Sequence, residues 1–283
     1  MAHPIVLPPR MCSTGADMLL AIDAGNTNIV FAVCDGRTIR NKWRLATNAT
    51  RTSDEYAVWL AELLKLHGLD FSRLTDAVIG TVVPAVLFDL RRLCREYLKC
   101  EPLIIGDPDV DLGIGVKTDR PNAVGADRIA NAVAAHDLHS GACVVVDFGT
   151  ATNFDVVSAA GDYEGGVIAP GVNLSAEVLH RAAALLPRVA IHRAQAVIGK
   201  DTVPAMQSGL YWGYVGLIEG LVSRIRAEHR EPMKVIATGG LAHLFERDIP
   251  AIEQVDDDLT IKGLMLIHAR NAGKRNRSSG NPA

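Results

Sequence analysis

Apolar and polar positions along the chain follow two alternating periods, one typical of strands and the other of helices. Residues 18–23 and 28–34 are short apolar runs, as expected for buried strands. Residues 53–68 repeat apolar side chains every three or four positions, with Ser53 suited to cap a helix and Gly68 suited to end it. The two patterns keep alternating along the chain, which predicts an α/β fold.

A strand–turn–strand pattern near the start of the chain occurs a second time. In each copy an apolar strand ends in an aspartate, a glycine follows two positions later, and small polar residues lead into another apolar strand. The aspartate and glycine are Asp23 and Gly25 in the first copy, and Asp147 and Gly149 in the second. A repeat of such a long period indicates two copies of one structural unit. We expect two domains with a boundary near residue 140.

The two aspartate–glycine corners have the chemistry of a phosphate site. A plain β-turn explains the glycines, but burying an unpaired carboxylate at the end of an apolar strand is costly. Backbone N–H groups beside a glycine, together with the hydroxyls of Thr27 and Thr150, suit phosphate oxygens. The carboxylate of Asp23 can hold Mg²⁺ there, directly or through water. These features predict a nucleoside triphosphate held by both hairpins between two domains.

Two further motifs suit substrate binding, and each also has a purely structural explanation. Residues 237–240 end a strand with two glycines, which would let a flat adenine ring lie against the backbone, although a strand-to-helix turn explains them equally well. Residues 125–128 begin a helix, where Asp127 can accept or align the proton of a substrate hydroxyl and Arg128 can hold an anion. By spacing alone, helix capping by Asp127 with a solvated Arg128 is the better explanation.

A stripe of glycines points to close packing on one helix face. Gly209, Gly213, Gly216 and Gly220 share one face of a predicted helix, although each glycine disfavours the helix by about 1 kcal/mol relative to alanine. The large apolar residues between them argue against a broken helix. We therefore expect another backbone to approach this face, at a domain or subunit contact.

Composition and charge exclude several classes of protein. A net charge of −3 gives no reason to expect a nucleic-acid or membrane-surface partner, and no apolar run is long enough to cross a bilayer. The five cysteines are an odd number without a CxxC pair, which fits thiols in a reducing cytoplasm. Residues 1–17 and 273–283 are polar or proline-rich, so we expect a disordered leader and a disordered tail.

Taken together, the motifs resemble the type III pantothenate kinase family and follow its order over residues 18–272. The resemblance implies a duplicated actin-like (ribonuclease H-like) α/β fold with domains at 18–139 and 140–272 and ATP in the interdomain cleft. It also implies transfer of the ATP γ-phosphoryl group to the hydroxyl of pantothenate, the first step of coenzyme A biosynthesis. The motifs are DAGNTN at 23–28, GADR at 125–128, DFGTATNFD at 147–155, GGVIAPG at 165–171, IGKDTVPAMQSG at 198–209 and ATGG at 237–240.

The resemblance assigns roles to individual residues. Asp127 would be the proton acceptor, and Asp147 would bind a monovalent cation, K⁺ or NH₄⁺. Thr202 would contact pantothenate from the neighbouring subunit of a homodimer. The other pantothenate contacts would be Gly125, Ala126, Asp127 and Arg128, and those to ATP would be Asp23, Ala24, Gly25, Asn26, Thr27, Asn28, Ile29, Val30 and Thr150.

The sequence departs from the family pattern at two positions, and two other functions compete with the kinase. Thr118 stands where many relatives have a tyrosine or similar substrate-facing residue, and Asn153 stands where threonine is more usual. One alternative is an actin-like phosphotransferase or phosphohydrolase with another small substrate, since fold does not fix function. The other is a non-catalytic regulatory protein, but such a protein should have lost an acid, whereas Asp23, Asp127 and Asp147 are all present.

Overall fold

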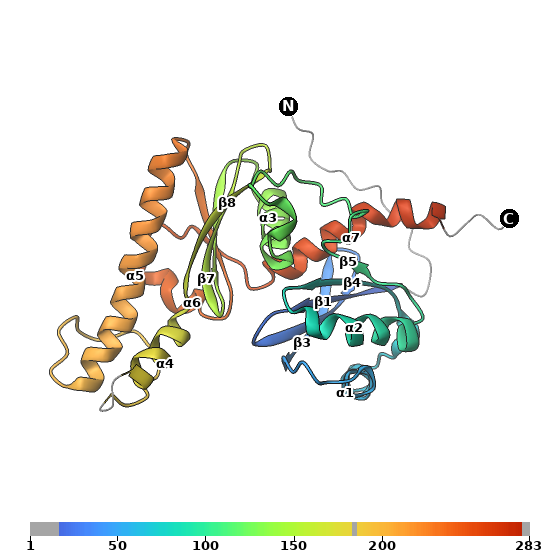
Figure 1. The fold of residues 1–283 in the computed structure, drawn as a ribbon, viewed down its shortest axis with the longest axis horizontal. Helices are drawn as coiled ribbons and strands as arrows, with labels where there is room; N and C mark the ends of the chain where they lie inside the picture. Colours follow the sequence, from blue (N-terminus) through green and yellow to red (C-terminus); the bar gives the residue numbers. More distant parts are fainter. Residues whose placement is uncertain (1–16, 183–185, 279–283) are drawn as a thin grey trace. The chain divides into compact units, whose positions relative to one another are not determined.

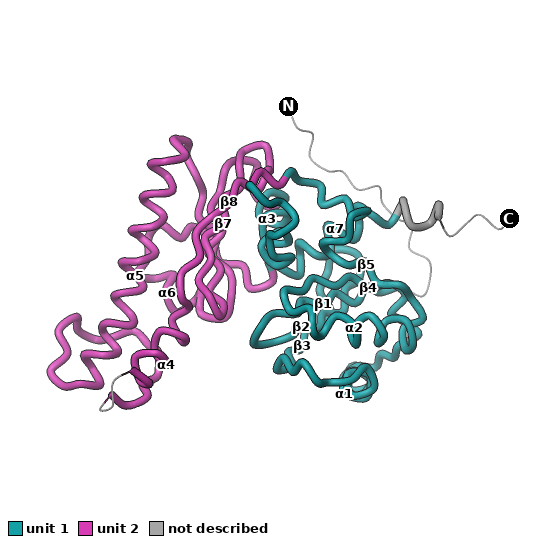
Figure 2. The backbone as a smooth tube through the Cα atoms, viewed as in Figure 1, with its two compact units in different colours: residues 1–115, 119–137, 259–283 teal, residues 116–118, 138–258 magenta. Residues whose placement is uncertain are grey.

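The computed structural model describes residues 17–182 and 186–278. Contacts divide the chain into two compact units, coloured separately in Figure 2. Unit 1 comprises residues up to 115, 119–137 and 259 onward, and unit 2 comprises 116–118 and 138–258. The expected leader therefore lies, except for Asp17, outside the described residues, as do residues 279–283 of the expected tail.

Unit 1 contains a five-stranded sheet in the order β3-β2-β1-β4-β5 (Figure 1). β1, β2 and β3 are antiparallel, whereas β4 lies parallel to β1 and β5 parallel to β4. The strands are β1 (Met18–Ala24), β2 (Asn28–Asp35), β3 (Thr38–Ala46), β4 (Leu74–Thr81) and β5 (Leu103–Ile104).

The helices of unit 1 cover both faces of this sheet. Side chains that alternate along a strand face opposite sides, and Ile79 packs in the core beneath α1 and α2 while the next residue, Gly80, meets Leu264 and Ala126 on the other side. The helical segments are α1 (Ser53–Leu66), η1 (Phe71–Arg73), α2 (Pro84–Leu93), η2 (Cys94–Leu98), η3 (Pro121–Ala123), α3 (Ala126–Leu138) and α7 (Leu259–Ser278).

The first helix begins with a different cap from the one expected. Thr52, not Ser53, is the N-cap: its hydroxyl accepts from the backbone N–H of Glu55, whose carboxylate accepts from the backbone N–H of Thr52. This reciprocal arrangement satisfies two backbone donors at once, which explains why Thr52 is preferred to Ser53. The helix ends at Leu66, with His67 as its C-cap.

Unit 2 repeats the plan of unit 1. Its sheet has the order β10-β9-β6-β7-β8. β6, β7 and β8 are antiparallel, whereas β9 lies parallel to β6 and β10 parallel to β9. The duplication and the α/β class are therefore confirmed. The elements are β6 (Cys143–Phe148), β7 (Ala151–Val157), β8 (Tyr163–Pro170), α4 (Val172–Ala182), α5 (Thr202–His229), β9 (Lys234–Thr238), α6 (Ala242–Phe245), η4 (Glu246–Asp248) and β10 (Gln254–Val255).

The compact units differ from the expected domains at the end of the chain. The break after Asp137 is close to the expected one, but α7 belongs to unit 1 rather than to the second domain. A Cβ on Gly263 would collide with the backbone carbonyl of Ala130, so α7 packs backbone to backbone against α3. α7 also continues to Ser278, beyond the point where the tail was expected to begin. Among the helices described, none is long and apolar enough to cross a membrane.

Candidate active site

The first aspartate–glycine corner is the turn between β1 and β2. The N–H of Gly25 donates to the carbonyl oxygen of Asn28 at 3.0 Å. Thr47, just after β3, makes two hydrogen bonds to this turn. Its hydroxyl donates to the carbonyl of Gly25 at 2.6 Å, and its N–H donates to the carbonyl of Thr27 at 3.0 Å. Asn26 and Thr27 themselves are exposed. The turn is thus fixed from behind and presents its polar tip outward.

The same corner connects to the start of α3 within unit 1. β1 and β4 are parallel, and where they end the N–H of Val82 donates to the carbonyl of Ala24 at 3.2 Å. A Cβ on Gly125 would lie 3.1 Å from Cγ1 of Val82 and 2.5 Å from Oδ1 of Asp127. Val82 therefore lies between the hairpin and α3. The structure brings together the predicted phosphate corner and the predicted proton acceptor, at the carboxyl ends of adjacent parallel strands.

Asp127 lies in the first turn of α3 but is not its cap. The carbonyl of Gly125 accepts the first helical hydrogen bond, from the N–H of Ile129 at 3.1 Å, and Oδ1 of Asp127 accepts from the N–H of Arg128 at 2.8 Å. Burial raises the pKa of the Asp127 carboxyl, and its interactions with Arg128 only partly oppose this shift. A raised pKa makes the carboxylate a stronger base than a solvated aspartate.

The second corner, between β6 and β7, is built on another glycine. The N–H of Gly149 donates to the carbonyl of Ala151 at 3.0 Å, and the N–H of Gly171 donates to the carbonyl of Thr150 at 3.1 Å. A Cβ on Gly171 would collide with that carbonyl oxygen. Gly149 and Thr150 are exposed. This turn is therefore supported by the backbone of Gly171, and its tip faces solvent.

Asp147 lies against the glycine pair that follows β9. In the parallel ladder Asp147 is opposite Thr238. The next residue, Gly239, has a φ of +90°, and a Cβ there would lie 2.6 Å from Oδ1 of Asp147 and 2.7 Å from the backbone of Phe148. Only glycine fits this close approach without strain. The ATGG motif and the second aspartate corner are therefore one structural cluster of unit 2.

The glycine stripe lies on the outer face of α5. Around Gly209, Gly213 and Gly216 a Cβ would meet nothing within 4 Å among the described atoms. The expected close backbone contact is therefore absent within the described chain. A hollow of about 700 Å³ lies between α4 and α5, lined by Ser175, Leu179, Leu186, Thr202, Ala205, Met206, Gly209, Leu210, Gly213, Tyr214 and Leu217.

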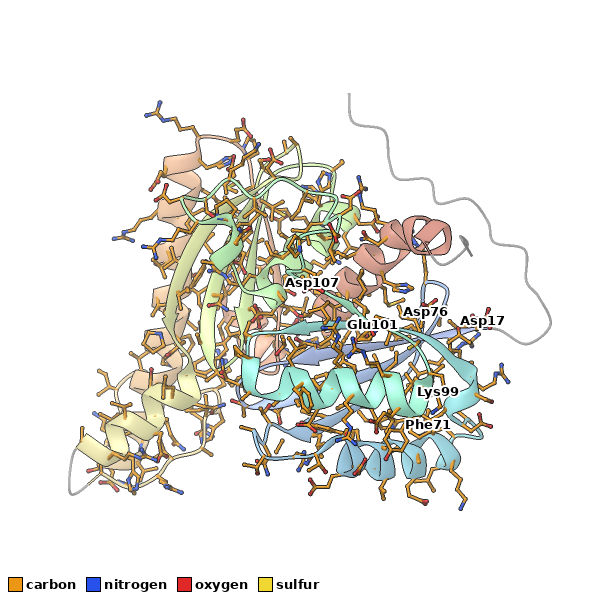
Figure 3. All side chains as sticks on the ribbon, turned by 45° about the vertical axis from the view of Figure 1, so that its right-hand side comes forward. Asp17, Phe71, Asp76, Lys99, Glu101 and Asp107 are labelled. Carbon is orange, nitrogen blue, oxygen red and sulfur yellow. The ribbon has the colours of Figure 1, made fainter. Side chains whose placement is uncertain are left out.

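A second, smaller hollow lies in unit 1, away from these motifs. Its volume is about 520 Å³, and it is bordered by η1, the start of β4 and the end of η2. Figure 3 labels two of its lining residues, Phe71 and Lys99. It contains none of the residues to which the sequence assigned a role.

The predicted site residues are divided between the units. Asp23 and Asp127 belong to unit 1, whereas Asp147, Thr150 and Thr202 belong to unit 2. Among the described residues, no group of three or more histidine, cysteine or acidic side chains is arranged to hold a metal ion.

Sequence reasoning missed the residues that support the corners. Thr47 and Val82 follow strands and carry no motif of their own, and Gly171 was seen only as the last residue of a family motif. Their roles depend on partners that are distant in sequence, since Thr47 contacts Gly25 and Gly171 contacts Thr150.

Known proteins resemble this chain over most of its length. The type III pantothenate kinase family model matches residues 19–224. A Rhodospirillum rubrum protein named type III pantothenate kinase is 60% identical over 254 residues, which cover 90% of this chain and 99% of that protein. One of the same name from Paramagnetospirillum magneticum is 60% identical over 255 residues, covering 90% of this chain and 98% of that protein.

Solved structures with low sequence identity share the fold. One is a Campylobacter jejuni chain described as a Baf family transcriptional activator, with a TM-score of 0.58, 19% identity, and coverage of 90% of this chain and 99% of that one. Another is the activator of 2-hydroxyisocaproyl-CoA dehydratase from Clostridium difficile, with a TM-score of 0.53, 11% identity, and coverage of 94% and 99%. These likenesses confirm the duplicated actin-like ATPase fold. The family match and the close relatives establish that the chain belongs to the type III pantothenate kinases, the ATP-dependent enzymes that phosphorylate pantothenate in coenzyme A biosynthesis.

Proposed function

We propose that the corner of unit 1 performs the proton-handling step of the kinase reaction. The observation that carries this proposal is that a Cβ on Gly125 would meet both Val82 and the Asp127 carboxylate, while the N–H of Val82 donates to the carbonyl of Ala24 in the first hairpin. The acid and the hairpin are therefore held in one cluster, as a base and a phosphate site in one reaction need to be.

The reaction assigns each group a task. The primary hydroxyl oxygen of pantothenate bonds to the γ-phosphorus of ATP, the bond from that phosphorus to the β–γ bridging oxygen breaks, and ADP leaves. Asp127 aligns the hydroxyl and accepts its proton, a role that suits a partly buried carboxylate with a raised pKa. Arg128, with Gly125 and Ala126, holds pantothenate, whose carboxylate suits a guanidinium.

ATP is contacted by residues 23–30 and by Thr150. Phosphate oxygens accept hydrogen bonds from backbone N–H groups at turns, and both turns expose their tips. Asp23 would hold Mg²⁺ through the phosphates or through water. Asp147 would hold K⁺ or NH₄⁺, whose charge would offset that of the triphosphate. A single carboxylate at each corner fits cations that keep water or phosphate ligands.

The outer face of α5 is the contact between two copies of the chain in a homodimer. Glycines on this face leave room for a second backbone. Two of them, Gly209 and Gly213, line the hollow between α4 and α5 together with Thr202. Apolar side chains on α4 and at the start of α5 are exposed, including Leu174 at 47% and Val178 at 54%. An exposed apolar face of this kind marks an interaction site. In the dimer, Thr202 contacts pantothenate bound by the other copy.

The enzyme works in the cytoplasm. The described cysteines, Cys34, Cys94, Cys100 and Cys143, form no disulfide with one another. Free and mostly buried thiols are typical of proteins in a reducing compartment.

A coupled assay of ADP release tests the function directly. With ATP, Mg²⁺ and a potassium salt, ADP release should depend on pantothenate and not on sugars, and it should slow when sodium replaces potassium. Release without pantothenate would favour a phosphohydrolase, and release with a sugar would favour another phosphotransferase. Indifference to the monovalent cation would remove Asp147 from its role.

The Asp127→Asn variant tests the proton acceptor. It should abolish turnover while ADP binding, measured by calorimetry, stays close to wild type. Asp137→Asn is a matched control, because Asp137 lies on the same helix and pairs with Arg37. Full turnover by Asp127→Asn, or equal losses in both variants, would contradict the assignment.

A further inference from the structure

The buried tyrosine Tyr214 links three elements of unit 2. It lies on α5 and is only 6% exposed. Its hydroxyl donates to the carbonyl of Pro170, the last residue of β8, at 2.5 Å. The same hydroxyl is 2.7 Å from the hydroxyl oxygen of Ser175 on α4. One phenol therefore ties α5 to the junction between β8 and α4.

That junction supports the second phosphate corner. Gly171, which follows Pro170, donates its N–H to the carbonyl of Thr150 at 3.1 Å. A Cβ on Gly171 would collide with that oxygen and lie 2.7 Å from the carbonyl oxygen of Gly149. The carbonyl of Gly171 accepts from the N–H of Ser175 at 2.9 Å. Backbone rests directly on backbone here, so a shift of Gly171 moves the turn with it.

We infer that Tyr214 is a positioning residue for nucleotide binding: its hydroxyl fixes Pro170 and Gly171, and these fix the turn at Gly149 and Thr150. This inference rests on the proposed contact between Thr150 and ATP. The aromatic ring has a separate role, because it packs against Phe245 in the core, with the two ring centroids 6.2 Å apart. Replacing tyrosine with phenylalanine therefore keeps the core contact and removes only the hydroxyl, with its connections to Pro170 and to Ser175.

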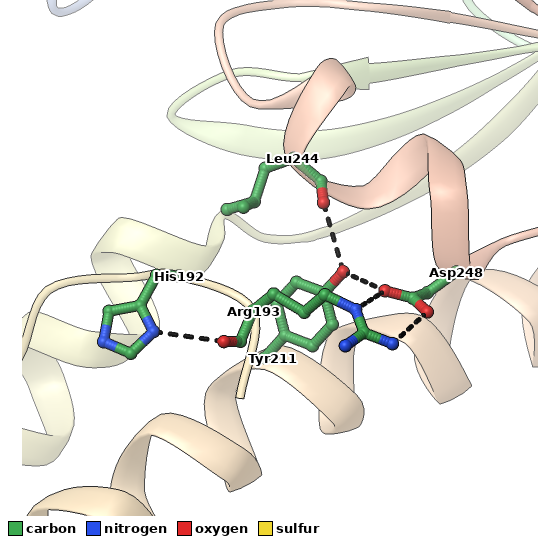
Figure 4. Close-up of polar contacts among 5 residues, drawn as sticks. All are labelled: His192, Arg193, Tyr211, Leu244 and Asp248. Carbon is green, nitrogen blue, oxygen red and sulfur yellow. Dashed lines mark hydrogen bonds and ion pairs between the residues drawn. The ribbon is translucent and has the colours of Figure 1, made fainter. Parts of the chain in front are cut away.

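The neighbouring tyrosine on the same helix provides a matched control. Tyr211 is also buried, and its single hydroxyl proton is shared between Oδ2 of Asp248, at 2.6 Å, and the carbonyl oxygen of Leu244, at 3.1 Å. Figure 4 shows this group, in which Arg193 also pairs with Asp248. The Tyr211 hydroxyl leads to α6 and η4 rather than to the hairpin. Tyr211→Phe thus removes a comparable hydrogen bond without touching the turn.

We expect different kinetics from the two variants. Tyr214→Phe should raise the KM for ATP about fivefold, the factor that corresponds to one ordinary hydrogen bond, and weaken ADP binding by a similar factor. The KM for pantothenate should stay within about twofold, which corresponds to less than half of that free energy. Tyr211→Phe should leave both nucleotide constants unchanged. Melting temperature and oligomeric state are measured for both variants, so that loss of folding is recognised.

The results distinguish this inference from the proposed function. Unchanged nucleotide constants in Tyr214→Phe, or equal changes in both variants, would overturn the role of Tyr214. ADP binding is measured without pantothenate, so an enzyme that binds ADP but does not phosphorylate pantothenate would refute the function alone.

A double-mutant cycle tests whether Tyr214 acts through the turn. In a Thr150→Ala background the hydroxyl contact of Thr150 with the nucleotide is removed and the backbone N–H groups of the turn remain, so adding Tyr214→Phe should weaken ADP binding less than in wild type. Fully additive effects would show that the tyrosine acts elsewhere and would overturn the inference.

Discussion

Replacing Gly239 with alanine should destabilise unit 2 and disturb the second corner. The residue has a φ of +90°, and the new Cβ would lie 2.6 Å from Oδ1 of Asp147 and 2.7 Å from the backbone of Phe148. The left-handed backbone costs about 1–2 kcal/mol with a side chain. Overpacking adds about 1–3 kcal/mol. A total near 3 kcal/mol would lower Tm by about 6–12 °C in a protein of this size.

Gly240→Ala is the control for this measurement. Gly240 is the next residue, and a Cβ there would meet nothing within 4 Å among the described atoms. The two variants are compared by calorimetric melting and by the ratio of activity in potassium to activity in sodium. Gly239→Ala should melt lower and lose part of the potassium preference, because the new methyl group displaces the Asp147 carboxylate. Equal melting temperatures for the two variants would refute the packing argument.

Three further predictions concern pH and assembly. Asp127→Asn should raise Tm near neutral pH, because burial raises the pKa of the native carboxyl and disfavours its ionised form in the folded state. Melting curves across pH should show this gain in Tm vanish in acid, where the wild-type carboxyl is protonated. Asp248→Asn should lower Tm at neutral pH, because hydrogen bonds from Arg193 and Tyr211 lower the Asp248 pKa to about 2. The difference in Tm between wild type and variant should shrink as the pH falls from 3.8, the ordinary aspartate pKa, towards 2. A difference in Tm that stays constant over this range would contradict the prediction. Gly213→Leu should fold, since its Cβ position is open, but light scattering should show a monomer with little kinase activity; an active dimer would place the subunit contact elsewhere.

The repeated parts of the site could be read from the sequence, because their signals are local. The acids at Asp23 and Asp147 follow apolar runs and precede glycines, and the structure places both at the ends of matching strands. The start of α3 at Ala126 also follows from its motif. The capping box at Thr52 was equally local, since Glu55 stands three residues later, but the adjacent Ser53 obscured it.

The supporting contacts could not be read, because each depends on a partner far away in the chain. Tyr214 contacts a carbonyl 44 residues earlier, and no pattern near position 214 indicates it. The return of α7 to unit 1 likewise depends on the fit of Gly263 against Ala130. Each of these contacts joins elements that are distant in the chain, so a local pattern carries no information about it.

The return of α7 has a consequence for how the chain is made. Leu264 fills the space beside Gly80, yet all of residues 138–258 are synthesised between α3 and α7. A nascent chain on the ribosome can therefore complete unit 2 while unit 1 still lacks a wall of its core. A protein cut after residue 258 would leave that wall open, and we expect it to be bound by chaperones rather than to accumulate as a half-sized enzyme.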